Sequence, residues 1–155
     1  MLLDTMLQFS NNQAVTASAA STYGIDIGIG RNLGAGEPLF LVTVLTADMT
    51  DVGSDTTITP TLRTSATATG SGSGLNGSIA LTGSITTLLT QTTFPALSKA
   101  GTKVINYLPP SDSYEQYLDV YYTAANGNLT TGNFTSFICK DTDLQHFYPA
   151  GYTIS

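Results

Sequence analysis

The scarcity of charged residues is the feature that most restricts what this chain can fold into. Only 10% of its 155 residues are charged, against about 25% in an average soluble domain. The polar residues are mainly hydroxyls, because the sequence contains 26 Thr and 14 Ser. An amphipathic helical bundle needs Glu, Lys and Arg on its outer faces, and intrinsic disorder usually combines low hydrophobicity with high net charge. Both classes are therefore excluded, and an all-β domain remains.

Length and net charge limit the domain count and the partners. A chain of 155 residues and 16.2 kDa suits a single domain, which can bury about 70% of its unfolded surface. The sequence has 5 Lys and Arg against 11 Asp and Glu, which gives a net charge of −6. Such a chain cannot form a basic patch for a run of phosphates, so we expect no binding to nucleic acid. No window approaches the ~18 apolar residues of a membrane helix, so we expect no membrane partner.

The N-terminus and the single cysteine predict the compartment. No Lys or Arg precedes the apolar start of the chain, and Asp4 and Gln8 interrupt it, so we expect no secretory signal. Cys139 has no second cysteine with which to form an internal disulfide. The protein is therefore expected to be made in a reducing cytoplasm.

Alternation of apolar and polar residues predicts about eight strands with sandwich-like spacing. The most apolar run, residues 39–47, is the candidate for a central strand. Pro60 has no amide hydrogen, so the strand at residues 56–66 is expected at a sheet edge or at a bulge. Asn126-Gly127 is a typical hairpin turn. The other strands are expected within residues 13–19, 23–29, 79–90, 102–108, 117–124 and 133–140. This pattern predicts an antiparallel jelly-roll β-sandwich.

The chain is predicted to be one jelly-roll domain over residues 1–155 with three distinctive segments. Residues 1–12 are expected to form an extended apolar N-terminal arm, and residues 141–155 a C-terminal tail. The Thr/Ser/Gly-rich region at residues 64–93 is expected to be an insertion or a variable region. Within it, Gly72, Gly74 and Gly77 formally match a dinucleotide fingerprint, but strand-like residues follow instead of a helix. We therefore interpret this stretch as an exposed loop.

Two polar clusters are candidates for chemical sites. Asp48, Asp51 and Asp55 could supply oxygen ligands to calcium, although their spacing is not that of a calcium loop. A structural ion there remains an open alternative. Cys139 and His146 could form a nucleophile pair, but Cys139 falls within an alternating strand, where a cysteine behaves as a small hydrophobe. We therefore predict no catalytic residue, no metal site and no cofactor, and expect that the protein is not an enzyme.

The two chain ends carry the predicted partner contacts. Apolar and aromatic residues on a terminus are typical interface material. The alternative is that both ends pack on their own sandwich. The predicted contact residues are Leu2, Leu3, Met6, Leu7 and Phe9 in the arm and Tyr148 and Tyr152 in the tail.

Several short pieces of sequence, in order over nearly the whole chain, match a known pattern. They are Leu3-Asp4-Thr5, Gln13-Ala14-Val15-Thr16, Ile25-Asp26-Ile27-Gly28, Leu108-Pro109-Pro110, Tyr117-Leu118-x-Val120-x-Tyr122, Thr131-Gly132-x-Phe134-Thr135 and Tyr148-Pro149-Ala150-Gly151-Tyr152. Together they resemble a jelly-roll family of capsid cement (decoration) proteins of tailed bacteriophages. The region at residues 64–93 departs from the pattern of that family.

The resemblance implies a structural virion protein on the capsid exterior, made in the host cytoplasm. Such a protein binds the outer surface of the phage capsid shell, bridges neighbouring major capsid subunits and stabilises the shell. The resemblance also implies a homo-oligomer, with a dimer favoured, and no catalytic residues.

The alternative function is a carbohydrate- or receptor-binding β-sandwich module of a virion or cell surface. Such modules bind through exposed aromatic side chains, and Tyr114, Tyr117, Tyr121 and Tyr148 are the candidates. Against this alternative, the chain has no Trp, the residue with the largest stacking surface.

Overall fold

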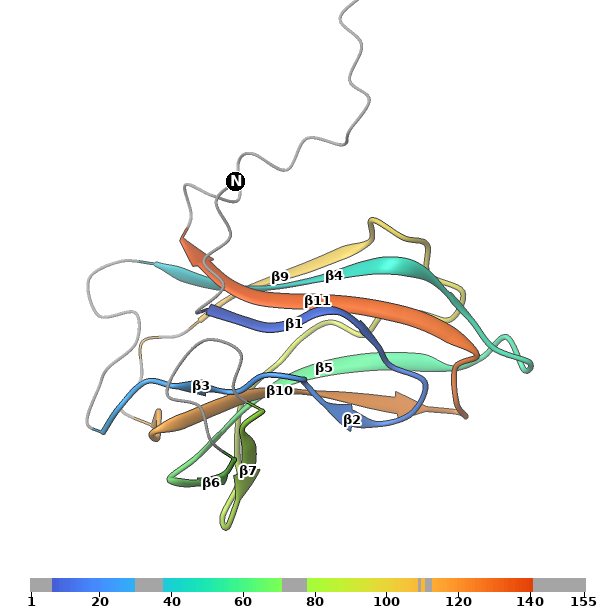
Figure 1. Cartoon of the computed structure of the whole chain (residues 1–155). Helices are drawn as coiled ribbons and strands as arrows, with labels where there is room; N and C mark the ends of the chain where they lie inside the picture. The colour runs from blue at the N-terminus through green and yellow to red at the C-terminus, as the bar shows by residue number, and fades with distance from the viewer. Residues whose placement is uncertain (1–6, 30–37, 71–77, 109, 111–112, 141–155) are drawn as a thin grey trace, which may run out of the picture.

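The computed structural model describes residues 7–29, 38–70, 78–108, 110 and 113–140 (Figure 1). Almost all of its regular structure is β-strand. The strands are β1 (Gln8–Ala14), β2 (Ala19–Ala20), β3 (Ile25–Asp26), β4 (Leu39–Thr50), β5 (Thr57–Ser65), β6 (Thr67–Thr69), β7 (Ala80–Thr82), β8 (Thr86–Thr90), β9 (Lys103–Tyr107), β10 (Tyr117–Ala125) and β11 (Thr131–Lys140).

Two antiparallel sheets pack face to face (Figure 1). The first has the order β1-β11-β4-β9, and the second has the order β2-β10-β5-β8, with β3 also paired to β10. If β2 and β3 are counted as one strand and the β6–β7 hairpin is set aside, eight strands remain. When these eight are renumbered along the chain, their spatial order is 1-8-3-6 in the first sheet and 2-7-4-5 in the second. This is the order of a jelly roll. The prediction of an all-β antiparallel sandwich of about eight strands is confirmed.

The first strand differs from the prediction. β1 covers Gln8–Ala14, so the expected strand at residues 13–19 is wrong, and residues 8–12 are not part of an extended arm. The register of β1 against β11 shifts between Gln8 and Ser10 and again between Ser10 and Gln13. Such shifts break the two-residue alternation by which a strand is recognised in a sequence. Residues 1–6 and 141–155 lie outside the described residues.

Pro60 lies in an internal strand, so the sheet-edge alternative is wrong, whereas the pairing of this strand with β8 does contain a register shift, between Leu62 and Arg63. β5 pairs with β10 on one side and β8 on the other. Ile58 exchanges backbone hydrogen bonds with Phe94, and the carbonyl of Pro60 accepts one from Gln91 at 2.9 Å. The backbone amide and carbonyl groups of residues 58 and 60 therefore point to the same edge of β5, the edge that pairs with β8. At this position β8 has already ended, so the ladder is interrupted. The missing amide hydrogen of Pro60 thus costs no ladder hydrogen bond.

The turn at Asn126-Gly127 joins the two sheets, so its interpretation as a hairpin turn is wrong. β10 belongs to one sheet and β11 to the other, and both turn residues have positive φ (66° and 138°). The turn reverses the chain as expected, but the two strands that it joins do not pair with each other.

The Thr/Ser/Gly-rich region is only partly separate from the sandwich. Residues 64–65 belong to β5, and residues 86–90 form β8, which pairs with β5. Between them, the β6–β7 hairpin projects from the second sheet (Figure 1). Its base is attached by the hydroxyl of Ser65, which donates to the carbonyl oxygen of Thr82 at 2.5 Å. The described part that stands off the sandwich is therefore shorter than residues 64–93.

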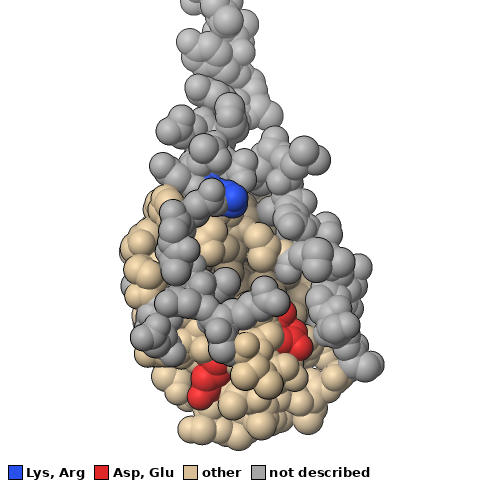
Figure 2. Space-filling view, turned by 90° about the vertical axis from the view of Figure 1, so that its left-hand side faces the viewer, with Lys and Arg blue, Asp and Glu red and all other residues tan. Residues whose placement is uncertain are grey.

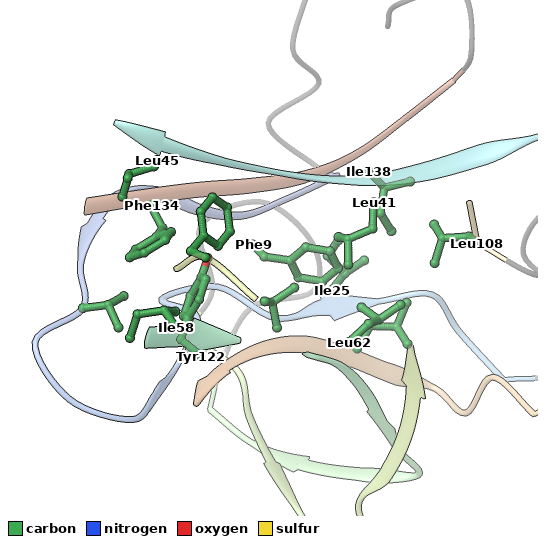
Figure 3. Close-up of a cluster of buried hydrophobic side chains, with 14 of the residues drawn as sticks. Phe9, Ile25, Leu41, Leu45, Ile58, Leu62, Leu108, Tyr122, Phe134 and Ile138 are labelled. Atoms are coloured by element: carbon green, nitrogen blue, oxygen red, sulfur yellow. The ribbon is translucent and has the colours of Figure 1, made fainter. Parts of the chain in front are cut away.

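The core between the sheets is apolar and aromatic (Figure 3). Phe9, Ile58, Tyr122 and Phe134 lie together in it, and each is fully buried. The Phe134 ring lies 5.3 Å from the Phe94 ring and 5.3 Å from the Tyr122 ring, measured between centroids. Aromatic pairs at this separation stabilise a core beyond their buried area.

A buried chain of hydrogen bonds also crosses this core. The Tyr122 hydroxyl, from the second sheet, lies 2.6 Å from Ser10 Oγ and 2.7 Å from Ser136 Oγ, both in the first sheet. Ser136 Oγ lies 2.8 Å from Thr43 Oγ1, which donates to Gln91 Oε1. Because every member has a partner, the network stabilises one relative position of the two sheets.

Candidate interaction surface

The face of the β1-β11-β4-β9 sheet that points away from the core is apolar. Cross-strand pairing aligns Phe137, Val42 and Ile105 in one row and Cys139, Phe40 and Tyr107 in the next. An antiparallel sheet with one face on the core normally presents polar residues on the other. We call this group of six residues the outer apolar face: Phe40, Val42, Ile105, Tyr107, Phe137 and Cys139.

Burial varies across the outer apolar face. Val42 and Phe137 in the middle of the sheet are buried, whereas Ile105 and Tyr107 on the edge strand β9 are 37% and 46% exposed. The Phe40 and Tyr107 rings pack edge to face, with centroids 5.7 Å apart. Exposed apolar side chains next to a buried apolar cluster are the usual composition of a protein contact surface.

None of the predicted contact residues that the structure describes belongs to this face. Leu2, Leu3 and Met6 in the arm and Tyr148 and Tyr152 in the tail lie outside the described residues. Leu7 is half-buried and packs against the core. Phe9 is fully buried in the core of its own sandwich, so it cannot contact a partner, and its predicted role is wrong.

The chain enters and leaves the sandwich at the same end of this sheet. β1 begins at Gln8, which lies opposite Phe137, and β11 ends at Lys140, three residues beyond Phe137 (Figure 1). The two strands are neighbours in the sheet. The outer apolar face includes Phe137 and Cys139, so it reaches the end of the sheet where both termini begin.

Two of the three aspartates considered as calcium ligands, Asp48 at the end of β4 and Asp51 in the loop after it, accept hydrogen bonds from neighbouring groups. The carboxylate of Asp48 accepts from the Ala100 amide at 2.8 Å and from Lys99 Nζ at 3.0 Å, and these contacts lower its pKa. Asp51 Oδ2 accepts from the amides of Thr56 and Asp55, and the bonds from Thr56 chiefly lower its pKa. Within the described ranges, no three Asp, Glu, His or Cys side chains are grouped so that they could hold an ion.

Of the two residues considered as a nucleophile pair, only Cys139 lies within the described residues. Cys139 is buried on the outer apolar face beside Val42 and Phe137, as expected of a small hydrophobe. His146 lies outside the described residues.

An ion pair on the outer face of the second sheet was not found from the sequence. Arg63 on β5 donates to Asp119 on β10, with Nε to Oδ1 at 2.9 Å and Nη2 to Oδ2 at 2.5 Å. Asp119 is fully buried, and the guanidinium also lies 4.1 Å from the centre of the Tyr121 ring. The ion pair could have been predicted only from the register of β5 against β10, which places residue 63 opposite residue 119.

The tyrosines proposed for sugar binding are mostly engaged within the sandwich. Tyr114 is buried, and the guanidinium of Arg63 covers one face of the Tyr121 ring. The Tyr117 hydroxyl accepts from Gln116 Nε2 at 3.1 Å. Tyr148 lies outside the described residues. The geometry therefore provides little support for aromatic stacking on a sugar.

One side of the molecule shows how few charges the surface carries. Among the described residues visible in Figure 2, isolated charged side chains interrupt a surface of uncharged residues.

In the part of the chain that the structure describes, no helix is long and apolar enough to cross a membrane.

The strand order and the outer apolar face define the class of this protein: a jelly-roll β-sandwich with one apolar sheet surface. The sequence matches the Bbp16 family model over residues 9–138. The chain therefore belongs to the Bbp16 family. The match covers the sandwich from β1 to β11 and leaves out both terminal segments. No curated protein matches the sequence.

Proposed function

We propose that this protein is a non-enzymatic virion protein that binds the outside of a phage capsid shell. It bridges neighbouring major capsid subunits and thereby stabilises the shell. The observation that carries this proposal is the outer apolar face, with Ile105 and Tyr107 exposed on it. The resemblance to jelly-roll cement proteins supplies the identity of the partner.

The composition of the surface supports the same function. The protein has a mass of 16.2 kDa and a net charge of −6, and it carries few charged residues of either sign. Charged residues are generally depleted at the centre of protein interfaces. A weakly charged, hydroxyl-rich surface therefore suits close packing of many copies on a shell.

Rebinding to capsids that lack the protein tests the proposal. Purified protein is added to mature capsids of its phage from which it has been removed, and we expect saturable, stoichiometric binding and higher resistance of the shell to heating. Tyr107→Ser should weaken binding, because it removes an exposed ring from the outer apolar face. Val52→Ser is the matched control, since Val52 is 98% exposed in a loop away from this face. Failure of the wild-type protein to bind would overturn the proposal, and binding to cell-wall polysaccharide instead would favour the glycan-binding alternative.

A further inference from the structure

Strand β9 has an open edge. It is the last strand of its sheet, and no strand in the described ranges pairs with its outer side. On its inner side, the Leu108 amide donates to the Leu39 carbonyl at 2.9 Å, and the Leu45 amide donates to the Thr102 carbonyl at 2.8 Å. In an antiparallel ladder, hydrogen-bonded and non-hydrogen-bonded residues alternate. The backbone groups of Ile105 therefore point away from β4, at the open edge.

This edge carries few of the devices by which natural sheets prevent pairing. Edge strands are commonly protected by charged side chains, especially Lys, by proline, by bulges or by inward-pointing charges. β9 contains no proline, and its register against β4 is regular from Tyr107 to Lys103. Its one charged residue, Lys103, is at the first position of the strand. Ile105, in the middle, is apolar and 37% exposed.

We propose that β9 pairs antiparallel with β9 of a second copy, around a two-fold axis that passes through Ile105. This register places Ile105 opposite itself, as a hydrogen-bonded pair, because its amide and carbonyl both point outward. It also places Lys103 opposite Tyr107 of the second copy. No like charges then face each other, and each ammonium lies beside an aromatic ring.

The sequence of β9 favours a second copy as the occupant over a strand of another protein. The five residues are self-complementary in this register, with the apolar residue on the axis and the cation opposite the ring. A closed two-fold contact pairs both open edges at once. It also joins the two four-stranded sheets into one, so the outer apolar face becomes continuous across the axis. The inference specifies the interface of the dimer that belongs to the proposed function.

Cysteine cross-linking tests the register. Hydrogen-bonded antiparallel pairs have Cα atoms about 5.5 Å apart, which is within the range of a disulfide. We expect Ile105→Cys to form a covalent dimer on mild oxidation, whereas the wild type, whose Cys139 is buried, should not. Lys103→Cys alone should not cross-link, because its two copies would lie about 14 Å apart along the strands. Mixed with Tyr107→Cys, it should give a heterodimer.

Sedimentation equilibrium of a charge variant tests the interface without new covalent bonds. Ile105→Lys places two cations opposite each other across the interface. We therefore expect the dissociation constant of the dimer to be at least about tenfold higher for this variant than for the wild type. Thr87→Lys is the matched control on the exposed edge strand β8 and should leave the dimer unchanged.

The outcomes separate this inference from the proposed function. A dimer that forms without cross-linking at residue 105 overturns the β9 pairing, while shell rebinding still tests the function. A wild-type monomer whose shell binding is lost in Ile105→Lys also overturns self-pairing and assigns the edge to a strand of the shell. Cross-linking at residue 105 without any shell binding supports the dimer and contradicts the proposed function.

Discussion

Replacing Tyr122 with Phe removes the hydroxyl that links the two sheets within the core. That hydroxyl lies 2.6 Å from Ser10 Oγ and 2.7 Å from Ser136 Oγ. Neither serine loses its last partner, because Ser10 Oγ still accepts from the Ser136 amide and Ser136 Oγ still contacts Thr43 Oγ1. The ring and its packing are retained. We therefore expect the free energy of unfolding at neutral pH to fall by about 1–2 kcal/mol, the net value of two hydrogen bonds without an orphaned group.

The same substitution should change the dependence of stability on pH. Burial raises the pKa of Tyr122 from 10.0 to about 12. Above pH 10 the unfolded chain releases the tyrosine proton and the folded chain retains it, so unfolding becomes more favourable. The contribution of the Tyr122 proton to the free energy of unfolding is therefore fully present below pH 10. It is lost as the pH rises toward 12, by about 2–3 kcal/mol in all. Tyr122→Phe cannot show this part of the alkaline loss.

Urea unfolding at pH 7 and at several values between pH 10 and 12 measures both effects. Tyr117→Phe is the matched control, because Tyr117 lies on the same strand with a half-exposed side chain on the outer face. It should differ from the wild type by less than about 0.5 kcal/mol at neutral pH. If Tyr122→Phe is as stable as the wild type at pH 7 and has the same alkaline slope, the hydroxyl does not stabilise the two-sheet arrangement.

Three further predictions concern the ion pair, the N-terminus and salt. Arg63→Met should lower the free energy of unfolding by about 3–5 kcal/mol in urea, because it leaves buried Asp119 without its cation, and adding Asp119→Leu should recover most of the loss. By calorimetry, deleting residues 1–9 should destabilise the sandwich by about 3–5 kcal/mol because Phe9 is lost, whereas deleting residues 1–6 should leave it folded but weaken shell binding. Shell binding should change little with salt, since apolar contacts carry it; a steep loss would reveal an unrecognised charge patch.

The sequence was most informative where the alternation of residues is regular. β10 and β11 follow their predicted ranges within a few residues, because Leu118, Val120 and Tyr122 alternate with polar or exposed positions. Pairing between strands was not predictable, since it depends on contacts far apart in the chain. Arg63 and Asp119 are 56 positions apart, and only the register of β5 against β10 brings them together.

The outer apolar face contains none of the contact residues predicted from the sequence. Apolar residues near the N-terminus suggested an arm, yet Phe9 packs into the core, because β1 starts at Gln8 and its irregular register disguises the strand. Ile105 and Tyr107 belong to a predicted strand, but nothing in the sequence marks them as exposed. A sequence does not reveal whether an apolar residue lies on the inner or outer face until the sheet order is known.

The difference between the two sheets is the strongest structural reason to assign a partner to one of them. The outer face of β5 carries Thr59, Thr61 and Arg63, the polar pattern that an antiparallel sheet shows toward water. The outer face of β4 carries Phe40, Val42 and Val44 instead. Both strands are central in their sheets, and the chain is rich in threonine, so composition alone does not account for the contrast. Val42 and Phe137 on that face are already buried, but Ile105 and Tyr107 at its edge remain exposed. Exposed apolar side chains that adjoin an apolar cluster mark a contact site, so we expect the contact surface on the sheet of β4 and not on that of β5.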